Sequence, residues 1–180
     1  MSMLKHLVAG AAVIALTATA SAQAPKFGQP IAPADIAPWD ISIGPDGAGL
    51  PPGRGTPAQG EAVFAAKCQA CHGEKGAGRP NDRLVGGKGS LEAGKAPVKT
   101  VGSYWPYATT LFDYVKRSMP FTAPGSLSDD QVYGVVAYIL GEANILPKNA
   151  AVNASSLPNI AMPHRNGFVP DPRPEVELYR

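Results

Sequence analysis

The sequence has few of the side chains that build metal clusters. It contains two cysteines, Cys68 and Cys71, and three histidines. Beyond the first 22 residues the only histidines are His72 and His164. A structural zinc site takes four ligands, usually two pairs of Cys or His, and this chain is short of donors for one.

Net charge of either sign is also small. Lysine and arginine together number 16 against 14 acidic residues, which gives a formal charge of +2. Such a balance offers no basic footprint for nucleic acid and no polybasic patch for a membrane surface. We expect neither kind of partner.

Long hydrophobic runs are missing except near the start of the chain. Residues 7–20 read LVAGAAVIALTATA, which falls short of the roughly 18 residues of a membrane-spanning helix. Lys5 lies before this run, and the small-residue tripeptide that ends at Ala22 fits a cleavage site. We predict that residues 1–22 are a signal peptide and that the protein is exported to the periplasm, with no membrane span.

Proline and glycine, in contrast, are abundant, with 19 and 20 residues. They concentrate in residues 25–57, 73–106 and 147–174, and the stretches between these look helical. We predict extended, proline-rich arms over residues 23–55 and 147–180, on either side of a small helical domain.

Two helices are predicted from their ends. Thr56 is a good N-cap and Pro57 is pre-organised for the first turn, so a helix is expected to begin there and run to His72. Residues 108–118 place apolar side chains at helical spacing, and Pro120 follows soon after. Because proline cannot continue a helix, the second helix is expected to end there.

The third helix has the clearest pattern. Ser128 and Gln131 fit a capping box, and the helix is expected to end near Asn144. One continuous apolar face follows the cap: Val132, Val135, Val136, Ile139, Leu140 and Ala143. No alternating run bounded by hairpin turns appears, so the domain over residues 56–146 is predicted to be all-α.

The string CQACH at residues 68–72 permits three kinds of chemistry. A redox dithiol of the thioredoxin type would follow a strand and open a helix, whereas this pair ends a predicted helix. Zinc lacks further ligands. Covalent haem uses the whole motif, because each thiol can bond one vinyl group and His72 then lies under the iron. We predict one haem c, attached through Cys68 and Cys71.

Two methionines are candidates for the sixth iron ligand, whose thioether would raise the reduction potential. Met119 lies at a helix exit, and Pro120 fixes the backbone after it. Met162 lies in the C-terminal arm, where a core filler or a partner contact is the simpler interpretation. We predict that His72 and Met119 bind the iron.

Other residues are expected around this site. The second ring nitrogen of His72 needs an acceptor, expected to be the carbonyl of Pro80. The aromatic segment 103–107 could line the haem crevice, with Trp105 reaching a propionate, or could simply pack in the core. Three basic residues are candidates to neutralise propionates, with solvated surface positions as the alternative: Arg79, Arg83 and Lys99.

These features together resemble a class I cytochrome c domain. The resemblance covers residues 56–146 and rests on CQACH, on Met119-Pro120 and on the terminal helix, with Gly60, Phe64, Pro80 and Leu84 in matching places. It implies that the first and last helices cross, with Gly60 and Phe64 meeting the helix around Tyr138.

A narrower resemblance extends over nearly the whole chain after the signal peptide. WDISIGPDGAGLPPGRGT, DRLVGGKGSL, SYWPYATTLFDYVKRSMPFTAPGSLSDDQVY and MPHRNGFVPDPRPEV are similar to the cytochrome c subunit of bacterial sulfur-oxidation sulfane dehydrogenase. That subunit accepts electrons from a molybdenum-cofactor partner, like the cytochromes of related sulfite dehydrogenases. It is often longer and carries two haems, whereas this chain has a single CxxCH.

The resemblance implies a periplasmic monohaem electron carrier that is not itself an enzyme. Its donor would be a molybdenum-dependent sulfite or sulfane dehydrogenase, and its acceptor a further cytochrome or an oxidase. A haem enzyme with an open sixth iron position remains an alternative, as does a carrier for an unrelated dehydrogenase. The arms are expected to lie extended over the cytochrome domain or over a partner, with disordered tails as the alternative.

Overall fold

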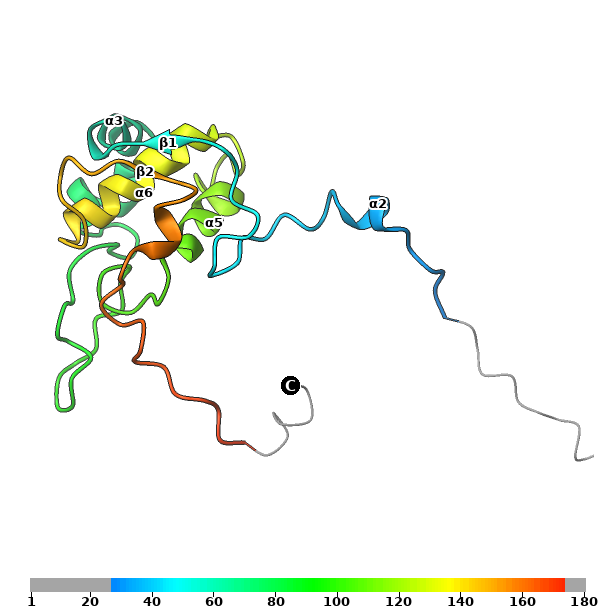
Figure 1. Cartoon of the computed structure of the whole chain (residues 1–180). Helices are drawn as coiled ribbons and strands as arrows, with labels where there is room; N and C mark the ends of the chain where they lie inside the picture. The colour runs from blue at the N-terminus through cyan, green and yellow to red at the C-terminus, as the bar shows by residue number, and fades with distance from the viewer. Residues whose placement is uncertain (1–26, 174–180) are drawn as a thin grey trace, which may run out of the picture. The chain divides into compact units, whose positions relative to one another are not determined.

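The computed structural model describes residues 27–173, so the predicted signal peptide at residues 1–22 lies outside it. The chain divides between Asp40 and Ile41 into two units. The described part of the first unit holds one short helix, α2 (Pro33–Ile36). The second unit holds all the other elements, and its longer helices form the core of the fold (Figure 1).

The first long helix, α3 (Pro57–Lys67), begins where the sequence predicts. The Thr56 hydroxyl accepts a hydrogen bond from the Gln59 N–H at 3.3 Å, and the Gln59 side chain accepts one from the Thr56 N–H at 2.9 Å. The predicted continuous helix to His72 is wrong, because Cys68 leaves helical geometry at φ −122°. A short second helix, α4 (Gln69–His72), follows this break.

The next helix, α5 (Ala108–Ser118), has the predicted span. It ends at Met119, whose backbone is extended at φ −122° and ψ 149°. This conformation is the one that a following proline favours, so Pro120 ends the helix and sets the direction of the chain at Met119.

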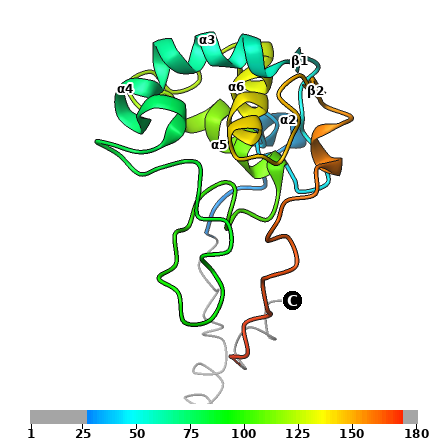
Figure 2. The same ribbon diagram turned by 90° about the vertical axis from the view of Figure 1, so that its left-hand side faces the viewer.

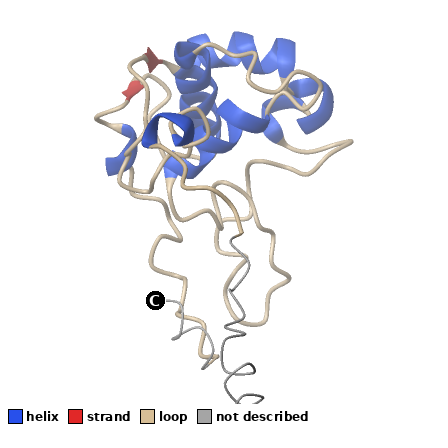
Figure 3. Cartoon of the chain, turned by 90° about the vertical axis from the view of Figure 1, so that its right-hand side faces the viewer, coloured by secondary structure: helices blue, strands red, loops and turns tan. Residues whose placement is uncertain are grey.

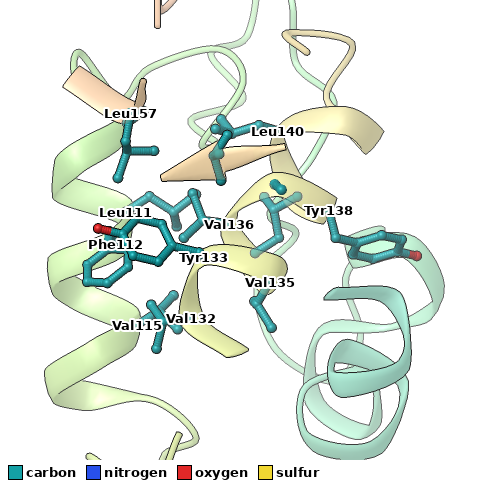
Figure 4. Close-up of a cluster of buried hydrophobic side chains, with 14 of the residues drawn as sticks. Leu111, Phe112, Val115, Val132, Tyr133, Val135, Val136, Tyr138, Leu140 and Leu157 are labelled. Carbon is teal, nitrogen blue, oxygen red and sulfur yellow. The ribbon is translucent and has the colours of Figure 1, made fainter. Parts of the chain in front are cut away.

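Helix α6 (Asp129–Glu142) opens with the predicted capping box between Ser128 and Gln131. Every residue from Val132 to Gly141 is buried, which is more than the single apolar face that the sequence indicates. Figure 4 shows why: α6 packs between α5 and α3, with Tyr133 directed toward α5 and Tyr138 toward α3.

The crossing of α3 and α6 is close enough to require glycine. A side chain at Gly60 would overlap the backbone carbonyl of Gly134. One turn further on, the rings of Phe64 and Tyr138 lie 5.1 Å apart. The predicted meeting of the first and last helices is therefore confirmed, and on the other face of α6 Tyr133 packs 4.4 Å from the ring of Phe112.

Two short strands were not predicted. Strand β1 (Arg54–Gly55) pairs antiparallel with β2 (Val152–Asn153), which joins the segments just before α3 and after α6 (Figure 3). Two-residue strands carry no alternating pattern, so the sequence offers no signal for them. The helix-rich class I cytochrome c fold stands.

Irregular segments complete the second unit. A 3₁₀ turn, Glu74–Gly76, follows α4, and another, Leu157–Asn159, lies beyond β2. Residues 86–99 form a loop that extends away from the helices (Figure 2). Within the described residues no helix is both long and apolar enough to cross a bilayer.

Candidate haem site

The four residues predicted to hold the haem all line one cavity. Cys68, Cys71 and His72 reach it from the end of α3 and from α4, and Met119 reaches it from the end of α5. The cavity has a volume of about 540 Å³, within the range of about 300–1,000 Å³ typical of ligand pockets. Residues far apart in sequence are thus brought to one place.

The two cysteines are spaced by a single turn of helix. The N–H groups of Cys71 and His72 both donate to the carbonyl of Cys68, at 3.1 and 2.9 Å. Cys68 is half-buried and Cys71 is exposed. One helical turn therefore presents both thiols and the imidazole to the same cavity.

The surroundings of Cys68 favour its neutral thiol form. Burial, together with the neighbouring charge of Cys71, raises the pKa of the Cys68 thiol to about 11. Within residues 27–173, no group of three or more His, Cys, Asp or Glu side chains is placed to hold a metal ion.

The orientation of His72 is fixed by a backbone acceptor. Its Nδ1 lies 2.9 Å from the carbonyl oxygen of Asp82, and since a carbonyl only accepts, Nδ1 carries the proton. This leaves Nε2 with a lone pair suited to a metal. The prediction that Pro80 supplies the acceptor is wrong. The chain turns back at Arg79, whose N–H donates to the carbonyl of Asn81. As a result, the carbonyl of Asp82, and not that of Pro80, accepts from the His72 ring.

The loop after His72 is tied to the haem-binding turn by further hydrogen bonds. The N–H of Asn81 donates to the Cys71 carbonyl at 2.9 Å, and the N–H of Gly78 donates to the His72 carbonyl at 2.7 Å. Gly73 begins this loop at φ +74°, and a side chain there would overlap the carbonyl of Gly78. These backbone hydrogen bonds therefore fix the position of the loop on the His72 side of the cavity.

Met119 is the candidate for the other iron ligand. Its N–H still bonds the Val115 carbonyl at 3.2 Å, so the end of α5 holds its backbone. Met162, the other candidate, is 4% exposed, packs in the hydrophobic core and is not among the residues that line this cavity. The core-filler interpretation of Met162 therefore agrees with the structure.

The remaining lining is mostly apolar, which suits a porphyrin. It includes residues that the sequence reasoning did not single out as part of a site: Leu111, Val115, Phe121, Thr122, Val135 and Ile139. Leu111, Val115, Val135 and Ile139 belong to apolar helix stripes, a signal that does not separate a cavity wall from ordinary core.

Aromatic and basic side chains lie at the same cavity. Trp105 lines it and meets Tyr114 edge to face, with ring centroids 6.0 Å apart. Arg83 and Lys99 line it too, whereas Arg79 does not. Two of the three basic residues considered for propionates thus lie at the cavity, and the residues present fit a haem.

Comparison with known proteins identifies the kind of domain. The family described as cytochrome c oxidase, cbb3-type, subunit III matches residues 55–139. Thiosulfate dehydrogenase from Psychrobacter arcticus is 32% identical over 85 residues, which are 44% of this chain and 24% of that protein. The chain therefore spans about a quarter of the length of that relative.

A solved structure matches over a longer stretch. A chain in the crystal structure of the sulfane dehydrogenase SoxCD from Paracoccus pantotrophus superimposes with a TM-score of 0.75 and 39% identity, covering 86% of this chain and 76% of that one. The helix crossing and the CQACH cavity define a cytochrome c domain of class I. The chain belongs to the cytochrome c family, an electron-transfer family whose cofactor is haem c, and the resemblance to sulfane dehydrogenase is confirmed.

Proposed function

We propose that this protein is a periplasmic monohaem cytochrome c that carries one electron at a time and does not transform a substrate itself. The observation that carries the proposal is the single cavity shared by Cys68, Cys71, His72 and Met119. Bound haem would supply a one-electron iron couple. The CQACH motif supports one covalently attached haem.

Each protein group has a distinct part in this proposal. Cys68 and Cys71 would form the two thioether bonds to haem, and the bond from His72 Nδ1–H to the Asp82 carbonyl leaves Nε2 to bind the iron. The thioether of Met119 would be the second protein ligand to the iron and would raise the reduction potential. The apolar walls keep water from the cofactor, which favours the reduced form as well.

The identity of the donor is proposed from the similarity to SoxCD. A sulfane dehydrogenase chain that is 39% identical over most of its length supports a molybdenum-dependent sulfur dehydrogenase subunit as the electron donor. A further cytochrome or an oxidase would then take the electron. Export by residues 1–22 places these steps in the periplasm.

Absorption spectroscopy of the haem-loaded protein tests the ligand set. Met119→Leu should remove the far-red iron–sulfur charge-transfer band of the oxidised state, because leucine has no sulfur to donate. Met162→Leu is the matched control and should keep the band. A band that survives in Met119→Leu would show that another residue binds the iron.

Mixing experiments test the electron-transfer role. The oxidised protein should become reduced when its donor subunit and sulfite or a sulfane compound are both present, and should stay oxidised with substrate alone. Since a relative is named thiosulfate dehydrogenase, thiosulfate is included as a substrate. A high-spin spectrum, rapid cyanide binding and turnover without a partner would instead establish a haem enzyme with an open iron position.

A further inference from the structure

The segment before the cytochrome domain exposes an unusual amount of apolar surface. We name residues 27–40, the described part of the first unit, the outer segment. Four large apolar side chains in it are exposed to solvent: Phe27 (89%), Ile31 (61%), Ile36 (44%) and Trp39 (83%). Taken by itself, this short unit has no core in which to bury these side chains, so they are available to pack against another surface.

The outer segment also has local order of its own. Helix α2 is followed by a turn in which the N–H groups of Trp39 and Asp40 bond the Ile36 carbonyl, at 2.8 and 3.0 Å. Three prolines restrict its backbone: Pro30, Pro33 and Pro38. A restricted segment loses less conformational entropy when it binds, so it is suited to docking.

The comparisons indicate which protein covers this segment. The cytochrome family match spans only residues 55–139, and the thiosulfate dehydrogenase match is also only 85 residues long. The SoxCD match covers 86% of the chain, so it extends well beyond the haem domain into both flanking arms. The arms are therefore shared with a sulfane dehydrogenase chain and not with haem binding in general.

We propose that the outer segment is a docking segment that binds an apolar groove on the electron-donating dehydrogenase subunit. The proposal rests on the proposed function for the identity of that subunit. Asp35 and Asp40 are the only charged residues of the outer segment. The groove should therefore be bordered by lysine or arginine side chains, which would complement these two carboxylates.

The first test removes the segment from the haem-loaded chain. Deleting residues 27–40 should leave the absorption spectrum, the midpoint potential and the unfolding midpoint unchanged, because the outer segment supplies no residue to the haem cavity. The affinity for the donor subunit, purified with its molybdenum cofactor, should fall at least 100-fold. An unchanged affinity overturns the docking proposal and leaves the electron-transfer role intact.

A point variant guards against effects of a large deletion. Trp39→Ser should weaken binding to the donor subunit by about 30-fold, the effect of removing an aromatic anchor from an interface. Val169→Ser is the matched control, since Val169 is 86% exposed but belongs to the C-terminal arm. Equal losses in the two variants would overturn the assignment of docking to the outer segment.

Other possible occupants give different results. If the outer segment covers its own haem domain, the deletion lowers the unfolding midpoint of the isolated chain. If it binds a second copy, sedimentation shows a dimer that becomes a monomer on deletion. Either result overturns the proposal, and so does a failure of the intact chain to bind the donor subunit, which would also remove that donor from the proposed function.

Discussion

The outer segment and the C-terminal arm are alike in sequence and opposite in structure. Both are rich in proline and carry scattered large apolar residues. In the C-terminal arm four of these side chains are buried in the main core, Val152, Leu157, Ile160 and Met162, whereas Phe168 and Val169 further along are exposed. In the outer segment the corresponding side chains are exposed. Apolar composition alone does not decide whether an arm packs on its own domain.

What separates the two arms is specific anchoring. In the C-terminal arm, β2 pairs with β1, and the Asn153 side chain accepts hydrogen bonds from the N–H groups of Ser155 and Ser156, both at 2.9 Å. These bonds fix the backbone so that Leu157 enters the core. The hydrogen bonds described for the outer segment lie in its own turns, such as those from the Trp39 and Asp40 N–H groups to the Ile36 carbonyl.

The largest expected difference between the arms is in stability. Leu157 is fully buried, so Leu157→Ala should lower the free energy of unfolding by about 2–5 kcal/mol, through lost apolar contact and the cavity left behind. Ile31→Ala, in the outer segment, should change it by less than about 0.5 kcal/mol. Denaturant unfolding of the haem-loaded protein measures both, and similar losses would contradict the comparison.

The C-terminal arm also contacts the neighbours of Trp105, a residue that lines the haem cavity. The ring of Tyr104 stacks on His164 with centroids 6.1 Å apart, and Phe168 lies edge-on at 5.2 Å. The guanidinium of Arg165 lies 5.2 Å from the centre of the Tyr107 ring. Tyr104 directly precedes Trp105 and Tyr107 lies two residues after it, so these contacts fix the chain on either side of Trp105, which lines the cavity.

Removing the packing of His164 and Phe168 on Tyr104 should lower stability by less than Leu157→Ala does. The double variant His164→Ala/Phe168→Ala should lower stability by about 1–2 kcal/mol, since aromatic pairs of this kind contribute about 0.5–1.5 kcal/mol each. It should also lower the midpoint potential of the haem, because a looser Trp105 segment admits water. Val169→Ala is the control. A potential that stays constant while stability falls would limit the contact to a structural role.

Local chemistry explains which parts of the fold the sequence predicted. The start of α3 follows from Thr56 and Pro57, and the end of α5 follows from Pro120, because each of these residues acts on its immediate neighbours. The break at Cys68 was missed because the sequence around it, residues 64–72, contains no proline or glycine that would mark the end of a helix. The pairing of β1 with β2 joins segments about a hundred residues apart and leaves no local pattern.

In the candidate site, too, local sequence predicts some residues, while others depend on how the chain folds. The CQACH motif identifies three side chains directly, and Met119 follows from the helix exit beside it. Asp82 could not be identified, because it acts through a backbone carbonyl that every residue has. Its position depends on how the loop folds back, through the bond from the Asn81 N–H to the Cys71 carbonyl.

The smallest expected effect concerns the residues just after the outer segment. The N–H of Ile43 donates to the carboxylate of Asp113 on α5 at 3.1 Å, and Arg117 donates to the same carboxylate. The side-chain hydrogen bond from Arg117, and with it the Ile43 N–H, holds the pKa of Asp113 below its ordinary value. A lowered pKa means that the ionised form stabilises the fold, so this contribution is present above the pKa of the unfolded chain and is lost as the pH falls through the folded value.

Asp113→Asn should therefore cost less than about 1 kcal/mol at pH 7, as expected of a partly exposed ion pair. Its deficit relative to the native protein should shrink as the pH falls below about 4, where the unfolded carboxyl titrates. Arg117→Gln should give a similar loss at neutral pH because it removes the other partner. Urea unfolding across this pH range measures the difference, and a deficit that does not change with pH would show that the Asp113 charge has no part in anchoring Ile43.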